Sequence, residues 1–149
     1  MAQRFNRFSL LLVFLLAGCN RYEVTFNQQP IHTPAKLLTG YEIADPALRS
    51  CVAQTIQDQQ ISRIDALKRL LCTNAGIGSL KGLEAFVGLE ILNLANNALS
   101  TIEPLHTLPS LAQLDLSANP GLKCNEIDAL TARGVTTTIP EHCKLGSTK

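Results

Sequence analysis

Several features that mark familiar classes of protein are missing from this 149-residue sequence. It has no cluster of basic residues and a formal net charge of only +1, which argues against nucleic acid as a partner. It has no C-x-x-C pair, so we predict no metal ion and no other cofactor. Its apolar run from Leu10 to Leu16 is shorter than the about 20 residues that a membrane-spanning helix needs.

The first residues have the pattern of a secretory signal. Arg4 and Arg7 supply positive charge, and the apolar run follows them. The run ends in Leu16-Ala17-Gly18-Cys19, which resembles the lipobox of bacterial lipoproteins. This resemblance implies cleavage before Cys19 and acylation of its thiol and new amino group, with palmitate as one such chain. An ordinary signal peptide with an incidental cysteine is the alternative.

The residue after the predicted lipid anchor bears on location. In bacterial lipoproteins of this kind an Asp there is the usual signal for retention in the inner membrane, and this sequence has Asn20. The resemblance therefore favours the outer membrane of a bacterial cell envelope. Loss of the two signal arginines leaves 11 basic against 12 acidic residues, a charge of −1. The acyl chain, and no basic patch, would hold the protein at the membrane.

One pattern of leucines occurs three times at a spacing of 22 residues, beginning at Leu67, Leu89 and Leu111. The second copy follows L-x-x-L-x-L-x-x-N-x-L and the third follows it through the asparagine, a pattern that resembles leucine-rich repeats. The first copy has Cys72 and Ala75 where Leu and Asn are expected. Because one such coil cannot bury its own leucines, we expect the copies to stack around a shared core.

Each copy is predicted to form one strand and one return segment. Leu92 and Leu94 alternate with Ile91, Asn93 and Ala95, as in a strand. In the return segment apolar residues recur at every third position, which suits a 3₁₀ turn. The sequence therefore predicts a short α/β solenoid, with a parallel sheet on its concave side and 3₁₀ or irregular segments on its convex side.

The asparagines of the pattern, Asn97 and Asn119, are predicted to be structural. Where the chain bends out of a strand, backbone groups lose their partners in the sheet. A short amide side chain can bond to those groups along the stack. We therefore leave both asparagines out of the predicted binding face.

The helical start at Asp45-Pro46 marks the predicted beginning of the folded domain, as a cap on the N-terminal end of the stack. Ser62 and Asp65 are predicted to form a second capping box. The predicted boundaries are a signal peptide (1–18), a lipidated anchor and tether (19–44), a leucine-rich repeat domain (45–143) and a tail (144–149). Within the domain they are an N-terminal cap (45–66), three repeats (67–88, 89–110 and 111–132) and a C-terminal cap (133–143).

Four cysteines remain beyond Cys19, an even number for an oxidising compartment, so we expect disulfides. Four cysteines allow three connectivities. Cys51 and Cys72 lie at the start of the predicted stack, and Cys124 and Cys143 lie at its end. The repeat geometry therefore predicts the pairs Cys51–Cys72 and Cys124–Cys143.

Residues 77–116 resemble the 22-residue repeats of bacterial surface proteins such as internalins. The resemblance implies a binding module that turns an open concave sheet toward a partner, and no enzymatic activity. Strand residues whose side chains point away from the leucines would then form the binding face. These are Arg69, Leu71, Thr73, Ile91, Asn93, Ala95, Gln113, Asp115 and Ser117.

We therefore expect a lipid-anchored envelope protein that binds a protein or a glycan through this face. A structural factor for envelope assembly without a dedicated ligand is the alternative. An enzyme is the least favoured hypothesis, because His32, His106 and His142 fall in the tether, a return segment and the C-terminal cap. Asp115 and Ser117 share a face, but no histidine shares it with them.

Overall fold

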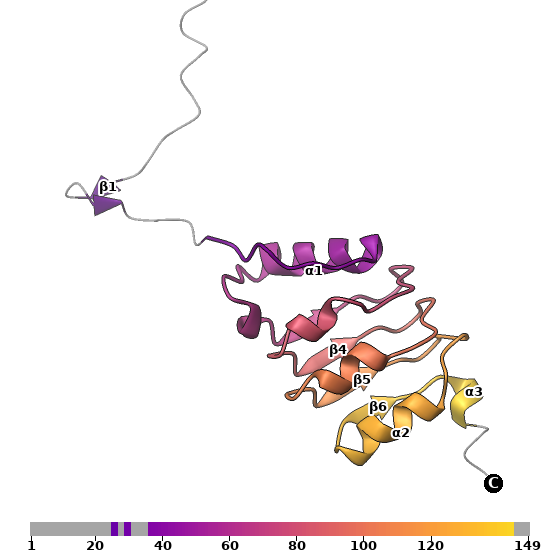
Figure 1. Ribbon diagram of the computed structural model, residues 1–149. Helices are drawn as coiled ribbons and strands as arrows, with labels where there is room; N and C mark the ends of the chain where they lie inside the picture. Colours follow the sequence, from indigo (N-terminus) through magenta and orange to yellow (C-terminus); the bar gives the residue numbers. More distant parts are fainter. Residues whose placement is uncertain (1–24, 27–28, 31–35, 145–149) are drawn as a thin grey trace, which may run out of the picture. The chain divides into compact units, whose positions relative to one another are not determined.

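The computed structural model describes residues 25–26, 29–30 and 36–144 (Figure 1). The chain divides into two compact units, 1–34 and 35–149. In the first unit, β1 (Thr25–Phe26) pairs with β2 (Gln29–Pro30) in antiparallel fashion. The predicted signal peptide, Cys19, His32 and residues 145–149 lie outside the described residues. None of the described helices is long and apolar enough to cross a membrane.

The second unit is built on a parallel sheet of four strands in the order β3-β4-β5-β6. In the first three strands, each residue pairs with the residue one repeat further along the chain. Arg69, Ile91 and Gln113 are therefore neighbours. A solenoid-like repeat fold with a parallel sheet is therefore what the structure contains. The strands are β3 (Arg69–Leu71), β4 (Ile91–Asn93), β5 (Gln113–Asp115) and β6 (Thr136–Thr138).

The core lies between this sheet and the return segments that stack beside one another (Figure 1). Leu70, Leu92 and Leu114 point inward from the middle of their strands and are at most 2% exposed. The return segments are η3 (Leu83–Ala85), η4 (Glu103–Thr107) and α2 (Asn125–Ala132).

The last return segment corrects one prediction, because α2 is an α-helix where a 3₁₀ or irregular segment was expected. Apolar residues at every third position fit both an α-helix and a 3₁₀-helix. Pro104 stands in the first turn of η4, whereas no proline interrupts residues 125–132. Acidic Glu126 and Asp128 in the first turn also favour an α-helix at this place.

The two asparagines of the motif hold successive coils together through their side-chain amides. Asn97 is 8% exposed, and its Oδ1 accepts from the backbone N–H of Ala75 at 3.1 Å and of Ile77 at 3.0 Å. Its Nδ2 donates to the carbonyl of Cys72 at 2.8 Å, one repeat back. Asn119 is fully buried and reaches back in the same way to the carbonyl of Leu94 at 3.0 Å. The prediction that both are structural is confirmed.

The N-terminal helix α1 (Pro46–Asp58) lies at one end of the stack, and α2 with α3 (Glu141–Lys144) lies at the other (Figure 1). Asp45 caps α1 by accepting from the N–H groups of Ala47 at 2.9 Å and Leu48 at 3.0 Å. The face formed by Leu48, Val52 and Ile56 is buried in the core.

The predicted capping box at Ser62 and Asp65 is wrong. The short helix η2 (Ile64–Ala66) begins after Arg63 and has no side-chain cap. The Asp65 carboxylate instead accepts from the Arg63 guanidinium at 2.6 Å. A two-residue spacing allows this ion pair between exposed side chains.

The folded unit begins earlier than Asp45, which corrects the predicted tether of residues 19–44. The Leu38 N–H donates to the carbonyl of Ile61 at 2.8 Å, and Ile43 is only 3% exposed. The rings of Tyr41 and Phe86 pack in a T-shaped arrangement with centroids 5.5 Å apart. Residues 36–44 therefore belong to the packed domain, because their apolar side chains cover η2 and η3.

Two disulfides are present, Cys51–Cys72 and Cys124–Cys143. The first joins α1 to the residue after β3, and the second joins the start of α2 to α3. Disulfides were expected, and the pairs are those that the positions at the two ends of the stack predict.

Candidate binding face

The nine predicted residues lie on the side of the sheet that faces away from the leucines, here called the open face. Strand register places Leu71, Asn93 and Asp115 side by side in one row. Backbone bonds from Asn74 to Ala95 and from Asn96 to Ser117 continue the pairing beyond the strands. The open face therefore presents three rows across the sheet: Arg69, Ile91, Gln113; Leu71, Asn93, Asp115; and Thr73, Ala95, Ser117.

Exposure falls from the first strand toward the middle of the open face. Leu71 is 57% exposed, a high value for a large apolar side chain. Ile91 and Asn93 in the neighbouring strand are half-buried. The structure adds Thr136 and Thr138 to the face, because they extend the first and second rows into β6. The prediction from sequence assigned these two residues to the C-terminal cap and did not count them in the binding face.

A shallow hollow of about 240 Å³ opens on this face. Its lining combines apolar groups from β3 and β4 with amide, carboxylate and hydroxyl groups from β4, β5 and β6. The outward-pointing residues are Leu71, Ile91, Asn93, Gln113, Asp115, Thr136 and Thr138.

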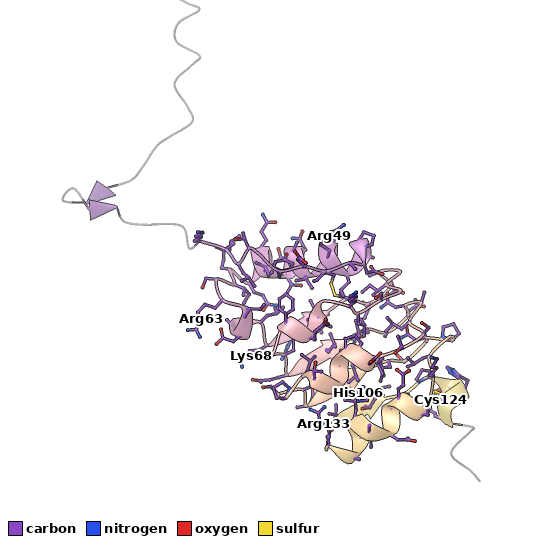
Figure 2. The ribbon with its side chains drawn as sticks, viewed as in Figure 1. Arg49, Arg63, Lys68, His106, Cys124 and Arg133 are labelled. Atoms are coloured by element: carbon purple, nitrogen blue, oxygen red, sulfur yellow. A yellow bond between two sulfur atoms is a disulfide. The ribbon has the colours of Figure 1, made fainter. Side chains whose placement is uncertain are left out.

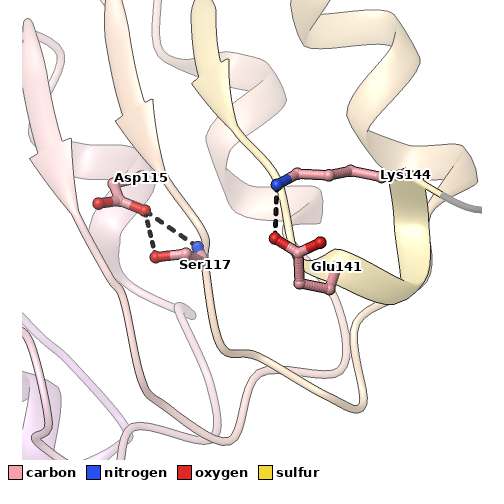
Figure 3. Close-up of polar contacts among 4 residues, drawn as sticks. All are labelled: Asp115, Ser117, Glu141 and Lys144. Carbon is pink, nitrogen blue, oxygen red and sulfur yellow. Dashed lines mark hydrogen bonds and ion pairs between the residues drawn. The ribbon is translucent and has the colours of Figure 1, made fainter.

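Hydrogen bonds fix the polar centre of the open face (Figure 3). Asp115 Oδ1 accepts from the Ser117 backbone N–H at 3.0 Å and from its hydroxyl at 2.7 Å. Asn93 Nδ2 donates to Asp115 Oδ2 at 3.4 Å, and Asn93 Oδ1 accepts from the Ala95 N–H at 3.0 Å. Asp115 Oδ2 makes only that one long bond here, so it can accept from a donor on a partner.

Charge is spread over the domain and does not gather on the open face, where Arg69 and Asp115 are the ionisable residues among the nine. Figure 2 labels Arg63, Lys68 and Arg133, cations that are not among the nine. Lys68 pairs with Glu90 at 3.1 Å, and Arg63 pairs with Asp65. Arg133 donates to the carbonyl of Leu108 at 2.7 Å. The face is therefore suited to neutral hydrogen-bonding and apolar contacts rather than to a strongly charged ligand.

The described histidines lie outside the open face. His106 is in η4, and His142 is in α3. The Asp115–Ser117 pair consequently lacks the imidazole that would take a proton from the serine hydroxyl. The described part of this face therefore has a hydroxyl and a carboxylate in contact but no histidine beside them.

A second hollow, of about 770 Å³, lies between the segment 40–44 and η3. Tyr41, Arg49, Lys81 and Glu84 are among its lining residues. Sequence reasoning missed it, because residues 40–44 were assigned to the tether and because no motif links them to η3. Its signs of charge are mixed and indicate no particular ligand.

Comparison with known proteins gives one family match. Residues 87–132, which contain the whole of the second and third repeats, match the family model "Leucine Rich repeats (2 copies)". No curated protein matches the chain significantly.

Solved structures similar to this chain include the CBM51-2 and INT domains of Clostridium perfringens ZmpB, with 22% identity and a TM-score of 0.40. That match covers 58% of this chain and 20% of the other. An internalin, InlF of Listeria monocytogenes, has 16% identity and a TM-score of 0.45. The match covers 65% of this chain and 36% of the internalin. This chain therefore corresponds to less than half the length of either solved structure.

Proposed function

We propose that the chain, which contains leucine-rich repeats over residues 87–132, is a binding module that presents its open face to a protein partner. The observation that carries this proposal is the apolar side chain of Leu71, 57% exposed beside Ile91 and the ordered polar groups of Asn93 and Asp115. Leucine-rich repeats commonly mediate protein interactions, and this face combines an apolar contact with directed hydrogen-bonding groups.

The size of the face limits how much of a partner it contacts. Four strands at about 4.8 Å spacing give a sheet less than about 20 Å across. A stable interface buries about 800 Å² on each partner. The open face therefore supplies the centre of the contact, and residues beyond the strand ends supply its rim.

A glycan is the second candidate ligand. The hydroxyl groups of Thr136 and Thr138 and the amide of Gln113 lie together in the hollow on the face. Hydroxyl and amide groups can exchange hydrogen bonds with sugar hydroxyls. No contact on this face favours a role in envelope assembly without a dedicated ligand. No arrangement of the described residues favours an enzymatic role.

The lipid anchor is part of the same proposal and rests on the sequence around Cys19. Acylation there would hold the domain at the outer membrane of a bacterial cell envelope. Changing Cys19 to Ala should release the protein from the membrane fraction. If wild-type protein takes up no labelled fatty acid and Cys19→Ala still sediments with membranes, the anchor is excluded.

Photo-crosslinking in intact cells tests the open face. A photoreactive residue at Gln113 should capture a partner, whereas the same residue at Glu103, in return segment η4, should not. Captured proteins are then identified by mass spectrometry. A crosslink to a sugar chain, with no partner protein attached, would favour the glycan.

A matched pair of substitutions separates the face from general surface hydrophobicity. Leu71→Glu changes an exposed apolar residue on the open face, and Val87→Glu changes one, 44% exposed, that lies outside it. Both should leave stability within about 0.5 kcal/mol of wild type, because surface changes usually do. Leu71→Glu should abolish capture and Val87→Glu should not. Equal capture by both variants would place the binding surface elsewhere.

A further inference from the structure

Three side chains with metal-binding chemistry converge at the C-terminal end of the stack. The sulfurs of Cys124 and Cys143 and a ring nitrogen of His142 all lie within 4.8 Å of one another. Among the residues that the structure describes, this is the one group of three or more Cys, His, Asp or Glu side chains whose ligand atoms approach so closely. His142 Nε2 is 3.4 Å from Cys143 Sγ.

We propose that Cys124, His142 and Cys143 bind a thiophilic divalent cation such as Zn²⁺ when the Cys124–Cys143 disulfide is reduced. Two thiolates and one imidazole are ligands that Zn²⁺ prefers. Three protein ligands leave the fourth tetrahedral position for water. The prediction from sequence considered only C-x-x-C pairs and did not weigh these three residues together.

The geometry needs little rearrangement. In a tetrahedral zinc site the ligand atoms are about 3.5–3.8 Å apart, as follows from Zn–S and Zn–N bonds of about 2.3 and 2.0 Å. The distance from His142 Nε2 to Cys143 Sγ, 3.4 Å, is already close to this range. The two sulfurs, 2.06 Å apart in the disulfide, must separate, which rotation of the Cys side chains allows with the Cα atoms 5.3 Å apart.

Access and proton placement set two further conditions. His142 is exposed and Cys124 is half-buried, so an ion can reach the group from solvent although Cys143 is buried. His142 Nε2 also lies 3.0 Å from the carbonyl of Leu122. Ligation through Nε2 therefore requires the ring proton on Nδ1, and the contact with Leu122 is given up.

The reduced and oxidised states exclude each other. A dithiol reductant donates two electrons and two protons to the Cys124–Cys143 bridge and is itself oxidised to a disulfide. Each new thiol releases its proton as its sulfur ligates the cation. A bound cation then blocks renewed disulfide formation, so the same two cysteines are either a covalent bridge or a metal site.

Cobalt titration tests the proposal, with the full chain carrying Cys19→Ser so that only the four domain cysteines remain. After reduction by a phosphine, one Co²⁺ per chain should bind with the sulfur-to-cobalt absorption of tetrahedral thiolate ligation, and Zn²⁺ should displace it. The unreduced chain should show no such absorption. His142→Ala should weaken binding at least about tenfold, since loss even of outer-shell partners has that effect. His106→Ala should not.

Two further measurements exclude binding by the other cysteines or by unfolded chain. The double variant Cys51→Ala/Cys72→Ala should retain the cobalt spectrum, and Cys124→Ser/Cys143→Ser should lose it. Zn²⁺ should raise the Tm of the reduced chain, because only ligands that prefer the folded state do so. No binding after reduction, equal binding by His142→Ala, or binding without a rise in Tm would each overturn the proposal.

Discussion

At its N-terminal end the stack is closed by the residues that precede the first repeat, and at its C-terminal end by α2 of the last repeat together with the residues that follow it. The first repeat lacks the motif asparagine and has Ala75 there. Asp45, which precedes this repeat, instead bonds to backbone groups that follow Ala75. Its Oδ2 accepts from the N–H groups of Gly78 at 2.9 Å and Ser79 at 3.1 Å, while its Oδ1 caps α1.

The C-terminal end uses two long side chains, Glu126 of the last repeat and Arg133 directly after it. Glu126 Oε2 accepts from the Thr101 hydroxyl and from the Ile102 N–H, both at 2.7 Å. Arg133 donates to the carbonyls of His106 at 2.6 Å and Leu108 at 2.7 Å. Both side chains therefore reach back to the second repeat and tie its return segment to α2.

The difference lies in how many bonds depend on one residue. At the N-terminal end the Asp45 carboxylate accepts four backbone N–H bonds. At the C-terminal end the comparable bonds are divided between Glu126 and Arg133. A single substitution should consequently damage the first end more than the second, and this expectation orders the predictions that follow.

Asp45→Ala should have the largest effect. Loss of a helix N-cap costs about 0.5–2 kcal/mol, and the N–H groups of the first repeat lose their acceptor as well, so we expect a total of about 2–3 kcal/mol. Urea unfolding measures the change. Asp58→Ala is the control, because Asp58 only accepts from the exposed Gln54 side chain at 2.7 Å. Equal destabilisation by the two variants would contradict the role of Asp45.

Glu126→Ala should cost less, about 1–2 kcal/mol, because one acceptor of two bonds is lost while Arg133 still holds η4. The same unfolding assay applies. Asp128→Ala, two residues further along α2 and exposed, should change stability by less than about 0.5 kcal/mol. A cost as large as that of Asp45→Ala would show that the C-terminal end also depends on one residue.

Ala118 offers a stabilising change of about 1 kcal/mol. It adopts a left-handed φ of 54°, like Asn74 (54°) and Asn96 (56°) at the same position of the earlier repeats. Ala tolerates this conformation poorly, whereas Asn often adopts it. Ala118→Asn should therefore raise the Tm and extend the contact in which Asn96 donates to Asn74. Ala112→Asn, at an exposed site in the same repeat, is the control, and an equal rise there would refute the explanation.

Acid should produce the smallest effect, and only at the N-terminal end. Burial alone would raise the pKa of Asp45, but four backbone N–H donors outweigh it and hold the pKa below its ordinary 3.8. The stabilisation by the Asp45 carboxylate is thus complete above that value and is lost as pH falls through the folded-state pKa. The stability difference between wild type and Asp45→Asn should shrink between about pH 7 and pH 2. An unchanged difference would exclude this linkage.

Features that depend on the 22-residue period were predictable from sequence. The inward leucines, the outward rows of the open face and the backward bonds of Asn97 and Asn119 all repeat at that spacing, so each copy supports the others. The cysteine pairs were predictable for the same reason, because the period assigns each cysteine to one end of the stack.

Contacts that join unlike segments were not predictable in this way. No periodicity links Leu38 to Ile61 or Asp45 to Gly78, so residues 36–44 were mistaken for part of a tether. His142 and Cys124 meet because α3 packs beside the start of α2, an arrangement that depends on the path of the chain after β6. Of the candidate site, the three strand rows were predictable, while Thr136 and Thr138 required the position of the last strand.

The backward bonds of Asn97 and Asn119 have a consequence for how such a chain can change in length. Each amide contacts only its own coil and the one immediately before it. Duplication or deletion of a whole interior unit therefore alters how many such contacts exist without creating a new kind. Gene rearrangements in multiples of 22 codons are tolerable between the two ends, and the width of the open face can vary in evolution while both ends stay unchanged.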